Sequence, residues 1–153
     1  MKSTDDPVVR MAKLLAKYHY HMAKEIIEEL GFERGSQLVL QAVRKFAEDR
    51  LNGMRAEARE RGLPLDTLDT YLKVRDMPDN AQKRNPDNPA QVTSCGMDEV
   101  WSEYGEEGKA LGHLYCSIDH ALYKGWGAQL DRPACLTLGD ACCEFRVKQK
   151  RKS

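Results

Sequence analysis

Hydrophobic side chains recur every three or four residues through the first half of the chain, and this spacing predicts helices. The first predicted helix begins with an Asp6 cap and Pro7 and ends at Gly31. His19 falls inside its apolar stripe and Tyr20 faces solvent, so His19 is interpreted as a packed residue in preference to a ligand or base. The stripe expected to be buried consists of Val8, Met11, Leu15, Tyr18, Met22, Ile26 and Leu30.

A second helix is predicted from Ser36 to the segment Arg61 to Pro64, and a short third helix follows an Asp66 cap. The two long helices are expected to pair, so that residues 1–75 form a helical half. The positions expected to face the core of the second helix are Val39, Val43, Phe46, Ala47, Leu51, Met54 and Ala58.

The helical spacing of hydrophobic residues ends abruptly at residues 76–91. This segment contains three prolines and three asparagines and almost no apolar residues. Such a composition favours turns, so this segment is predicted to be a loop within the domain. Two interpretations of the loop stay open, a mobile flap over a site and a solvated connector.

Residues 92–147 return to regular patterns, with a short strand at 92–95, a brief helix over MDEVWSEYG and a helix over GHLYCSIDH. The closing CLTLGDACCEFRV predicts a hairpin that turns at Gly139 and Asp140 and places Cys143 in the core. Residues 148–153 are a basic tail, interpreted as solvated. The expected fold is therefore α+β, a single domain whose N-terminal helices pack on a small C-terminal antiparallel sheet.

Composition excludes several classes of function. The chain has 24 basic and 24 acidic side chains, so no net charge recruits nucleic acid or an anionic membrane. No apolar stretch is long enough for a spanning helix, and the start lacks the pattern of a signal peptide. The expectation is a soluble, cytoplasmic protein whose five cysteines are thiols, not a disulfide framework. The sequence is compatible with assembly into a homo-oligomer.

The candidate chemistry lies in GHLYCSIDH, which gathers a thiol, a carboxylate and two imidazoles. On a helix, His113, Cys116 and either Asp119 or His120 follow at spacings of three or four, and therefore project from one face. A thiol near imidazole can be held partly as thiolate, the form that attacks electrophilic carbon or binds metal. A buried, inert Cys116 is the structural alternative.

Three motifs in this region resemble the L-2-amino-thiazoline-4-carboxylic acid hydrolase family. The first is Tyr115-Cys116-x-x-Asp119, the second is Gly139-Asp140-x-x-Cys143-x-Phe145, and the third is Thr93-x-Cys95 further upstream. Cys142 and the pair Trp126-Gly127 depart from the family pattern. The resemblance implies hydrolytic opening of a small cyclic isothiourea, with a small molecule as the partner.

Under this resemblance Cys116 is the expected nucleophile, Asp119 holds the protonated nitrogens of the substrate, and His113 or His120 carries the proton. Tyr115 and Cys95 are assigned to substrate binding. Arg146 is one candidate anchor for a substrate carboxylate.

Two alternatives remain. The cysteine-bearing C-terminal hairpin also looks like that of small-molecule-binding domains of the 4-vinyl-reductase type, which are not catalytic. Cys95, Cys116 and Cys143 with a histidine could instead hold zinc that activates water. Their spacing matches no zinc ribbon or finger, so no metal or other cofactor is expected, with zinc as the less favoured alternative.

Overall fold

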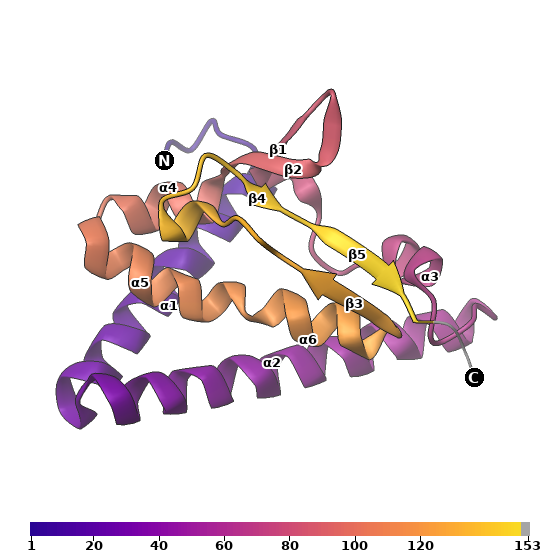
Figure 1. Cartoon of the computed structure of the whole chain (residues 1–153), viewed down its shortest axis with the longest axis horizontal. Helices are drawn as coiled ribbons and strands as arrows, with labels where there is room; N and C mark the ends of the chain where they lie inside the picture. The colour runs from indigo at the N-terminus through magenta and orange to yellow at the C-terminus, as the bar shows by residue number, and fades with distance from the viewer. Residues whose placement is uncertain (151–153) are drawn as a thin grey trace.

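The computed structural model describes residues 1–150 and has the α+β architecture expected. Figure 1 shows α2 along one side of the molecule, the consecutive helices α5 and α6 beside it, and the strands across the face opposite α2. The helices are α1 (Pro7–Leu30), α2 (Phe32–Glu60), α3 (Leu68–Val74), α4 (Gly96–Ser102), α5 (Gly105–Cys116) and α6 (Ile118–Gly125).

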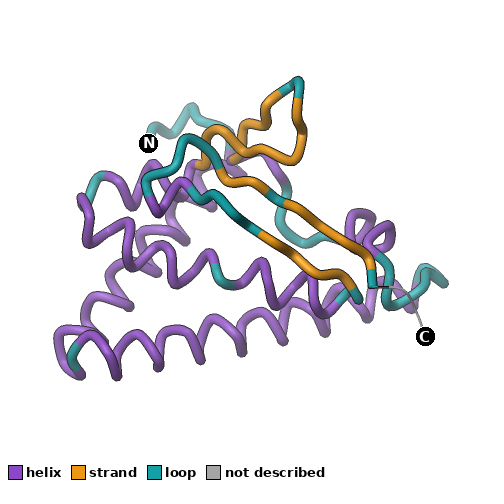
Figure 2. Tube along the Cα trace, in the orientation of Figure 1, coloured by secondary structure: helices purple, strands orange, loops and turns teal. Residues whose placement is uncertain are grey.

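The strands form two small antiparallel sheets. They are β1 (Gln82–Asn85), β2 (Asn88–Cys95), β3 (Ala128–Asp131), β4 (Cys143–Glu144) and β5 (Arg146–Gln149), together with the short 3₁₀ helices η1 (Asp79–Ala81) and η2 (Leu136–Leu138). One sheet has the order β1-β2-β4 and the other pairs β3 with β5. All of these strands follow α3 in the chain, and the three helices before them are purple in Figure 2, so the N-terminal part is helical as predicted.

The first helix has the predicted ends but buries a different face. Asp6 accepts hydrogen bonds from the backbone of Val8 and Val9, while Met11 and Tyr18, both expected in the core, are each 64% exposed. The buried residues are Ala12, Ala16, Tyr20 and Ala23. Small alanine side chains let the backbone approach its neighbours closely, and the indole of Trp101 donates to the carbonyl of Ala16. The predicted stripe is therefore wrong at Met11, Tyr18 and Met22, whereas Leu15 and Ile26 do pack against the core. Tyr20 is buried rather than exposed.

The second and third helices differ from prediction in detail. α2 begins at Phe32, so Ser36 lies inside the helix, where its hydroxyl donates to the Phe32 carbonyl instead of capping the helix. Phe46 is 40% exposed, whereas the other predicted core positions of α2 are buried. The cap of α3 is Thr67, whose hydroxyl accepts from the backbone of Thr70.

The segment predicted as a loop, 76–91, contains η1 and most of a β-hairpin. β1 pairs with β2 through a tight turn in which the Asn85 side chain accepts from the backbone of Asp87 and that of Asn88 accepts from Ala90. Asparagine side chains that bond to nearby backbone are typical of turns. The composition therefore predicted the turn correctly but did not indicate the two strands on either side of it.

The predicted C-terminal hairpin does not form. Leu136–Leu138 is a 3₁₀ helix that ends at Gly139, where φ is 90°. The expected second strand is divided into β4, which joins β2, and β5, which joins β3. The Asp140 carboxylate accepts from the backbone of Cys135 and closes the intervening loop. The tail predicted at 148–153 begins inside β5, and residues 151–153 lie outside the described part of the chain.

Trp101 and Trp126 lie at the centre of the larger core and are almost fully buried. A second, smaller core contains Val92, Cys135 and Cys143, so Cys143 is buried as expected. Within residues 1–150, no helix is both long and apolar enough to cross a membrane.

Candidate active site

A cavity of about 430 Å³ opens between the helical half and the motif-bearing half of the molecule. Its apolar wall comes from α1, α4 and α6, and includes Leu15, Trp101 and Leu122. The polar wall contains the side chains of Arg50, Tyr71, Arg75, Asp76, Asp79, Gln82, Arg84, Cys95, Tyr115, Cys116, Asp119 and Tyr123. Its volume is within the range of pockets that enclose small organic ligands.

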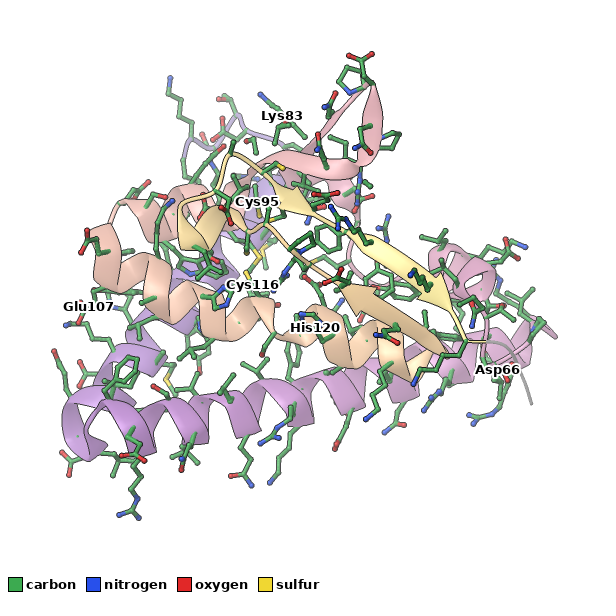
Figure 3. All side chains as sticks on the ribbon, viewed as in Figure 1. Asp66, Lys83, Cys95, Glu107, Cys116 and His120 are labelled. Atoms are coloured by element: carbon green, nitrogen blue, oxygen red, sulfur yellow. The ribbon has the colours of Figure 1, made fainter. Side chains whose placement is uncertain are left out.

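Cys116 and Asp119 line this cavity from either side of a helix break. Cys116 is the last residue of α5, and Asp119 lies in the first turn of α6. Between them, the Ser117 hydroxyl donates to the carbonyl of Leu114 at 2.6 Å, which satisfies an acceptor at the helix end. The spacing of three residues thus brings the thiol and the carboxylate to the same cavity, as the sequence indicated. Figure 3 shows Cys95 and Cys116 in the central part of the molecule.

Arg132 fixes this arrangement from the loop after β3. One guanidinium nitrogen donates to Asp119 Oδ2 at 2.8 Å, and another donates to the carbonyl of Cys116 at 3.0 Å. The Arg132 side chain is only 5% exposed, and its guanidinium also lies 5.9 Å from the centre of the Phe145 ring. A buried guanidinium with these contacts holds both candidate catalytic residues in one geometry.

The Asp119 carboxyl keeps 30% of its side-chain surface accessible. Burial raises its pKa, while the charges of Arg132 and Arg50 act in the opposite direction. The carboxylate is therefore less stable here than in water, and a cationic ligand in the cavity would favour its charged form.

Cys116 contacts sulfur rather than imidazole. Its thiol donates a hydrogen bond to Cys135, and this bond together with burial raises the pKa of Cys116. Cys143 also donates to Cys135, with 3.7 Å between the two sulfurs. Both bonds lower the pKa of Cys135, while the bond to Cys135 and burial raise the pKa of Cys143. No imidazole is among the groups that act on the pKa of Cys116, so a thiolate held by imidazole has no support in this geometry.

Neither histidine named from the sequence is among the described side chains that line the cavity. His113 Nδ1 lies 2.9 Å from the hydroxyl of Thr137, on the side of α5 that faces η2. His120 is exposed on α6. His19 is 2.9 Å from the carbonyl of Leu111 and packs against Trp101 and Tyr115, as expected of a packed residue.

Two of the three predicted substrate-binding residues, Tyr115 and Cys95, line the cavity. Burial raises the pKa of Tyr115 to about 12, and its buried hydroxyl has no partner among residues 1–150. Burial also raises the pKa of Cys95. Arg146 instead lies on β5, where its side chain is 57% exposed and pairs with Glu144 at 2.9 Å, away from the cavity wall.

Three other arginines line the cavity. Two guanidinium nitrogens of Arg50 donate to the two carboxylate oxygens of Asp76, at 2.9 and 2.6 Å. Arg75 pairs with Asp79 at 2.8 Å, and Arg84 approaches the same carboxylate at 3.6 Å. Arg84 therefore has the weakest carboxylate contact of the three.

The sequence reasoning missed Arg132, Cys135 and Arg84. Arg84 stands in the segment predicted as a loop, Arg132 stands in a segment with no predicted element, and nothing in their local spacing indicates a partner. Cys135 was placed on a hairpin strand, whereas it precedes a 3₁₀ helix and faces Cys116. Only the count of five cysteines hinted at a thiol cluster.

A metal site was the second enzymatic interpretation. Among residues 1–150, no group of three or more His, Cys, Asp or Glu side chains is arranged to hold a metal ion. Cys116 and Cys143 each interact with Cys135, but no histidine among residues 1–150 completes a ligand set with them.

The fold and the cavity define an α+β protein with a site for a small molecule, lined on one side by ionisable groups. The model of the L-2-amino-thiazoline-4-carboxylic acid hydrolase family matches residues 9–147, and the chain belongs to this family. This confirms the resemblance seen in the C-terminal motifs and extends it across the helical half. Neither a curated protein nor a solved structure matches the chain.

Proposed function

We propose that this protein hydrolyses a cyclic isothiourea of the 2-amino-thiazoline-4-carboxylate type, with Cys116 as the nucleophile. The observation that carries the proposal is that Cys116 and Asp119 line one cavity of about 430 Å³ while Arg132 contacts both residues. The family is named for hydrolysis of this substrate, which supports the class of reaction.

The reaction opens the ring at the carbon that lies between nitrogen and sulfur. The thiolate of Cys116 adds to this carbon, and the bond to the ring sulfur breaks, so that the sulfur leaves as a thiolate and takes up a proton. Water then adds to the same carbon and displaces Cys116. One water is consumed in total, and the product is a carbamoyl-cysteine with a free thiol.

Asp119 is suited to orient the substrate. A protonated cyclic isothiourea is an amidinium-like cation whose N–H groups can donate to a carboxylate. Arg132 occupies Oδ2 of Asp119 and fixes the plane of the carboxylate, while Oδ1 can accept from the substrate. The unpartnered Tyr115 hydroxyl on the same wall can supply a further hydrogen bond.

The substrate carboxylate requires a cation, and Arg84 fits this role better than Arg146. Arg84 lines the cavity with 34% of its side-chain surface accessible, and its nearest carboxylate oxygen is 3.6 Å away. One terminal nitrogen donates to the carbonyl of Pro89 at 2.9 Å, whereas the other has only long contacts to Asp79 and Gln82, so an incoming carboxylate competes with weak contacts at that second nitrogen. Arg75 lines the same wall, although its stronger bond to Asp79 makes it the less available cation.

The direct test is turnover of 2-amino-thiazoline-4-carboxylate, measured by release of the product thiol. Cys116→Ser replaces the soft nucleophile with a poor one and should abolish turnover, with circular dichroism and thermal melting close to wild type. Cys142→Ser, which changes a half-buried cysteine outside the cavity wall, is the matched control and should keep full activity.

If Cys116→Ser kept more than about a tenth of kcat, a loss below ~1.4 kcal/mol in the barrier, covalent thiol catalysis would be the wrong mechanism. Tight binding of the substrate without any turnover by the wild type would favour the non-catalytic binding domain. Loss of activity to a chelator, with recovery on adding zinc, would favour the zinc hydrolase.

A further inference from the structure

Two helices, α1 and α4, contribute only apolar side chains to the described lining of the cavity, and this part is called the α1–α4 wall. The lining residues of α1 follow one another at helical spacing, so they lie on one face. The indole nitrogen of Trp101 already donates to the carbonyl of Ala16. The wall therefore offers a ligand no side-chain hydrogen bond. It consists of Val8, Met11, Ala12 and Leu15 on α1 and of Met97 and Trp101 on α4.

The charged side chains of the cavity come from other elements. Among residues 1–150, those that line it belong to α2, to the segment 75–84 and to α6, where Asp119 lies. A pocket with polar groups on one part and apolar groups on another fixes the orientation of a ligand that has the same division. The cavity therefore fits a ligand with a polar end and an apolar end.

The ring of the proposed substrate supplies only the polar end. 2-Amino-thiazoline-4-carboxylate is one five-membered ring with an amino group and a carboxylate, so most of its edge is polar. The cavity of about 430 Å³ equals the volume of roughly 14 water molecules at about 30 Å³ each, more than a molecule of roughly nine non-hydrogen atoms occupies. With the nitrogens at Asp119 and the carboxylate at Arg84, the α1–α4 wall would stay in contact with water, which is unfavourable for apolar surface.

Three of the six methionines of the chain line this cavity. They are Met11 on α1, Met77 between α3 and η1, and Met97 on α4. Met97 is 7% exposed and Met11 is 64% exposed, so the methionines extend from the interior to the surface. Methionine is unbranched and polarizable, so it adapts to groups of different shape and makes favourable contacts with aromatic rings. Such side chains are suited to an apolar group that enters from the surface.

We propose that the substrate of this site carries an apolar substituent, aromatic or branched, which packs on the α1–α4 wall while the reacting ring lies at Cys116 and Asp119. The inference rests on the proposed function, because it names the class of substrate for the same site. Asp119 keeps its role at the nitrogens of the ring, and Met11 and Met97 determine the preference for the substituent.

The test compares kcat/KM for 2-amino-thiazoline-4-carboxylate with the values for two aromatic derivatives of this ring. One carries a benzyl group on the exocyclic nitrogen, and the other carries a phenyl group on the carbon next to the sulfur. At least one of them should exceed the unsubstituted ring by about tenfold or more, a factor that burial of roughly 60 Å² of apolar surface supplies. A hydroxyethyl group at each position is the polar control and should give no such gain.

A pair of methionine variants locates the substituent. Met11→Gln introduces a polar side chain of similar length at an exposed position, so the fold should be unaffected. It should lower the ratio of kcat/KM between the preferred aromatic derivative and the unsubstituted ring by about threefold or more, the effect of roughly 25 Å² of apolar contact. Met22→Gln is the matched control, because Met22 is 46% exposed on the same helix and is not among the described residues of the cavity. Equal ratios in the two variants would overturn the proposal.

Two amidinium ions that cannot be ring-opened test the wall without turnover. Acetamidine and benzamidine both present N–H donors to Asp119, but only benzamidine carries an aromatic ring. Calorimetry on the wild type should give a Kd at least about tenfold lower for benzamidine. Met11→Gln should reduce this difference, and Met22→Gln should leave it unchanged.

The proposed reaction and the proposed substituent therefore fail in different ways. If 2-amino-thiazoline-4-carboxylate is turned over and neither aromatic derivative exceeds it, the substituent is excluded while the reaction stands. If no ring compound is turned over, the reaction fails and calorimetry decides about the wall. Tighter binding of benzamidine that depends on Met11 would then support the apolar substituent, and equal binding of the two ions would overturn it.

Discussion

Asp119 is the residue where stability and the proposed activity conflict. Because burial raises its pKa, the folded protein holds the Asp119 proton more tightly than the unfolded chain does. The contribution of this proton to stability is complete below the unfolded pKa of about 3.9 and is lost as pH rises through the raised folded pKa. Substrate binding needs the ionised carboxylate, which is the form that stabilises the fold less. Asp119 therefore serves the proposed reaction at a cost to stability.

Asp119→Asn should separate these two effects. Asparagine resembles the protonated acid and can still accept from Arg132, so we expect the variant to melt at or above the wild-type temperature at neutral pH. Its kcat/KM should fall ten- to hundredfold, which corresponds to about 1.5–3 kcal/mol for a lost charge-assisted hydrogen bond. Thermal melts and initial rates on the same preparations give both numbers. A variant that melts well below wild type would show that the ion pair with Arg132 stabilises the fold.

The packing of α4 on α5 is the element-scale feature that supports the cavity wall. Trp101, on α4, is 1% exposed and lines the cavity, and Gly112 on α5 lies against its ring. A Cβ atom at Gly112 would come within 2.2 Å of Trp101 Cδ2. Glycine is required at this position because the indole ring occupies the space of a side chain.

Gly112→Ala should therefore destabilise the protein by roughly 1–3 kcal/mol, the usual cost of overpacking a core. Gly53→Ala is the matched control, because Gly53 lies inside α2 with nothing within 4 Å of its added Cβ. That variant should gain roughly 0.5–1 kcal/mol from better helix propensity. Urea unfolding measures both values, and equal stabilities in the two variants would show that α4 and α5 can separate at little cost.

The elements also show what local patterns can and cannot predict. Both ends of α1, the presence of α4 and the proximity of Cys116 to Asp119 depend on neighbours a few residues apart, and the sequence predicted them. Alternation suggested a hairpin over CLTLGDACCEFRV, but it could not show that β4 pairs with β2 and β5 with β3, strands outside that segment. Arg132 and Cys135 act through contacts that only the folded chain creates.

At the scale of the whole molecule, the cavity exists only because distant segments meet. α1 and α2 supply Leu15 and Arg50, the β1–β2 hairpin supplies Arg84, and the helices α5 and α6 supply Cys116 and Asp119. Figure 1 shows the hairpin projecting at the edge of the fold. The family match over residues 9–147 agrees with a site that needs both halves. A cytoplasmic location and assembly into a homo-oligomer stay predictions.

The set of residues that line the cavity predicts which arginine anchors the substrate. Arg84→Gln should raise KM for 2-amino-thiazoline-4-carboxylate about tenfold or more, since a charge-assisted hydrogen bond to a carboxylate contributes about 1.5–3 kcal/mol. Because the lost contact holds a part of the substrate that does not react, kcat should change much less. Arg146→Gln is the control, since Arg146 is exposed and pairs with Glu144 outside the cavity, and it should leave KM unchanged. Steady-state kinetics on the two variants decides the matter, because a rise in KM in Arg146→Gln alone would return the anchor to β5.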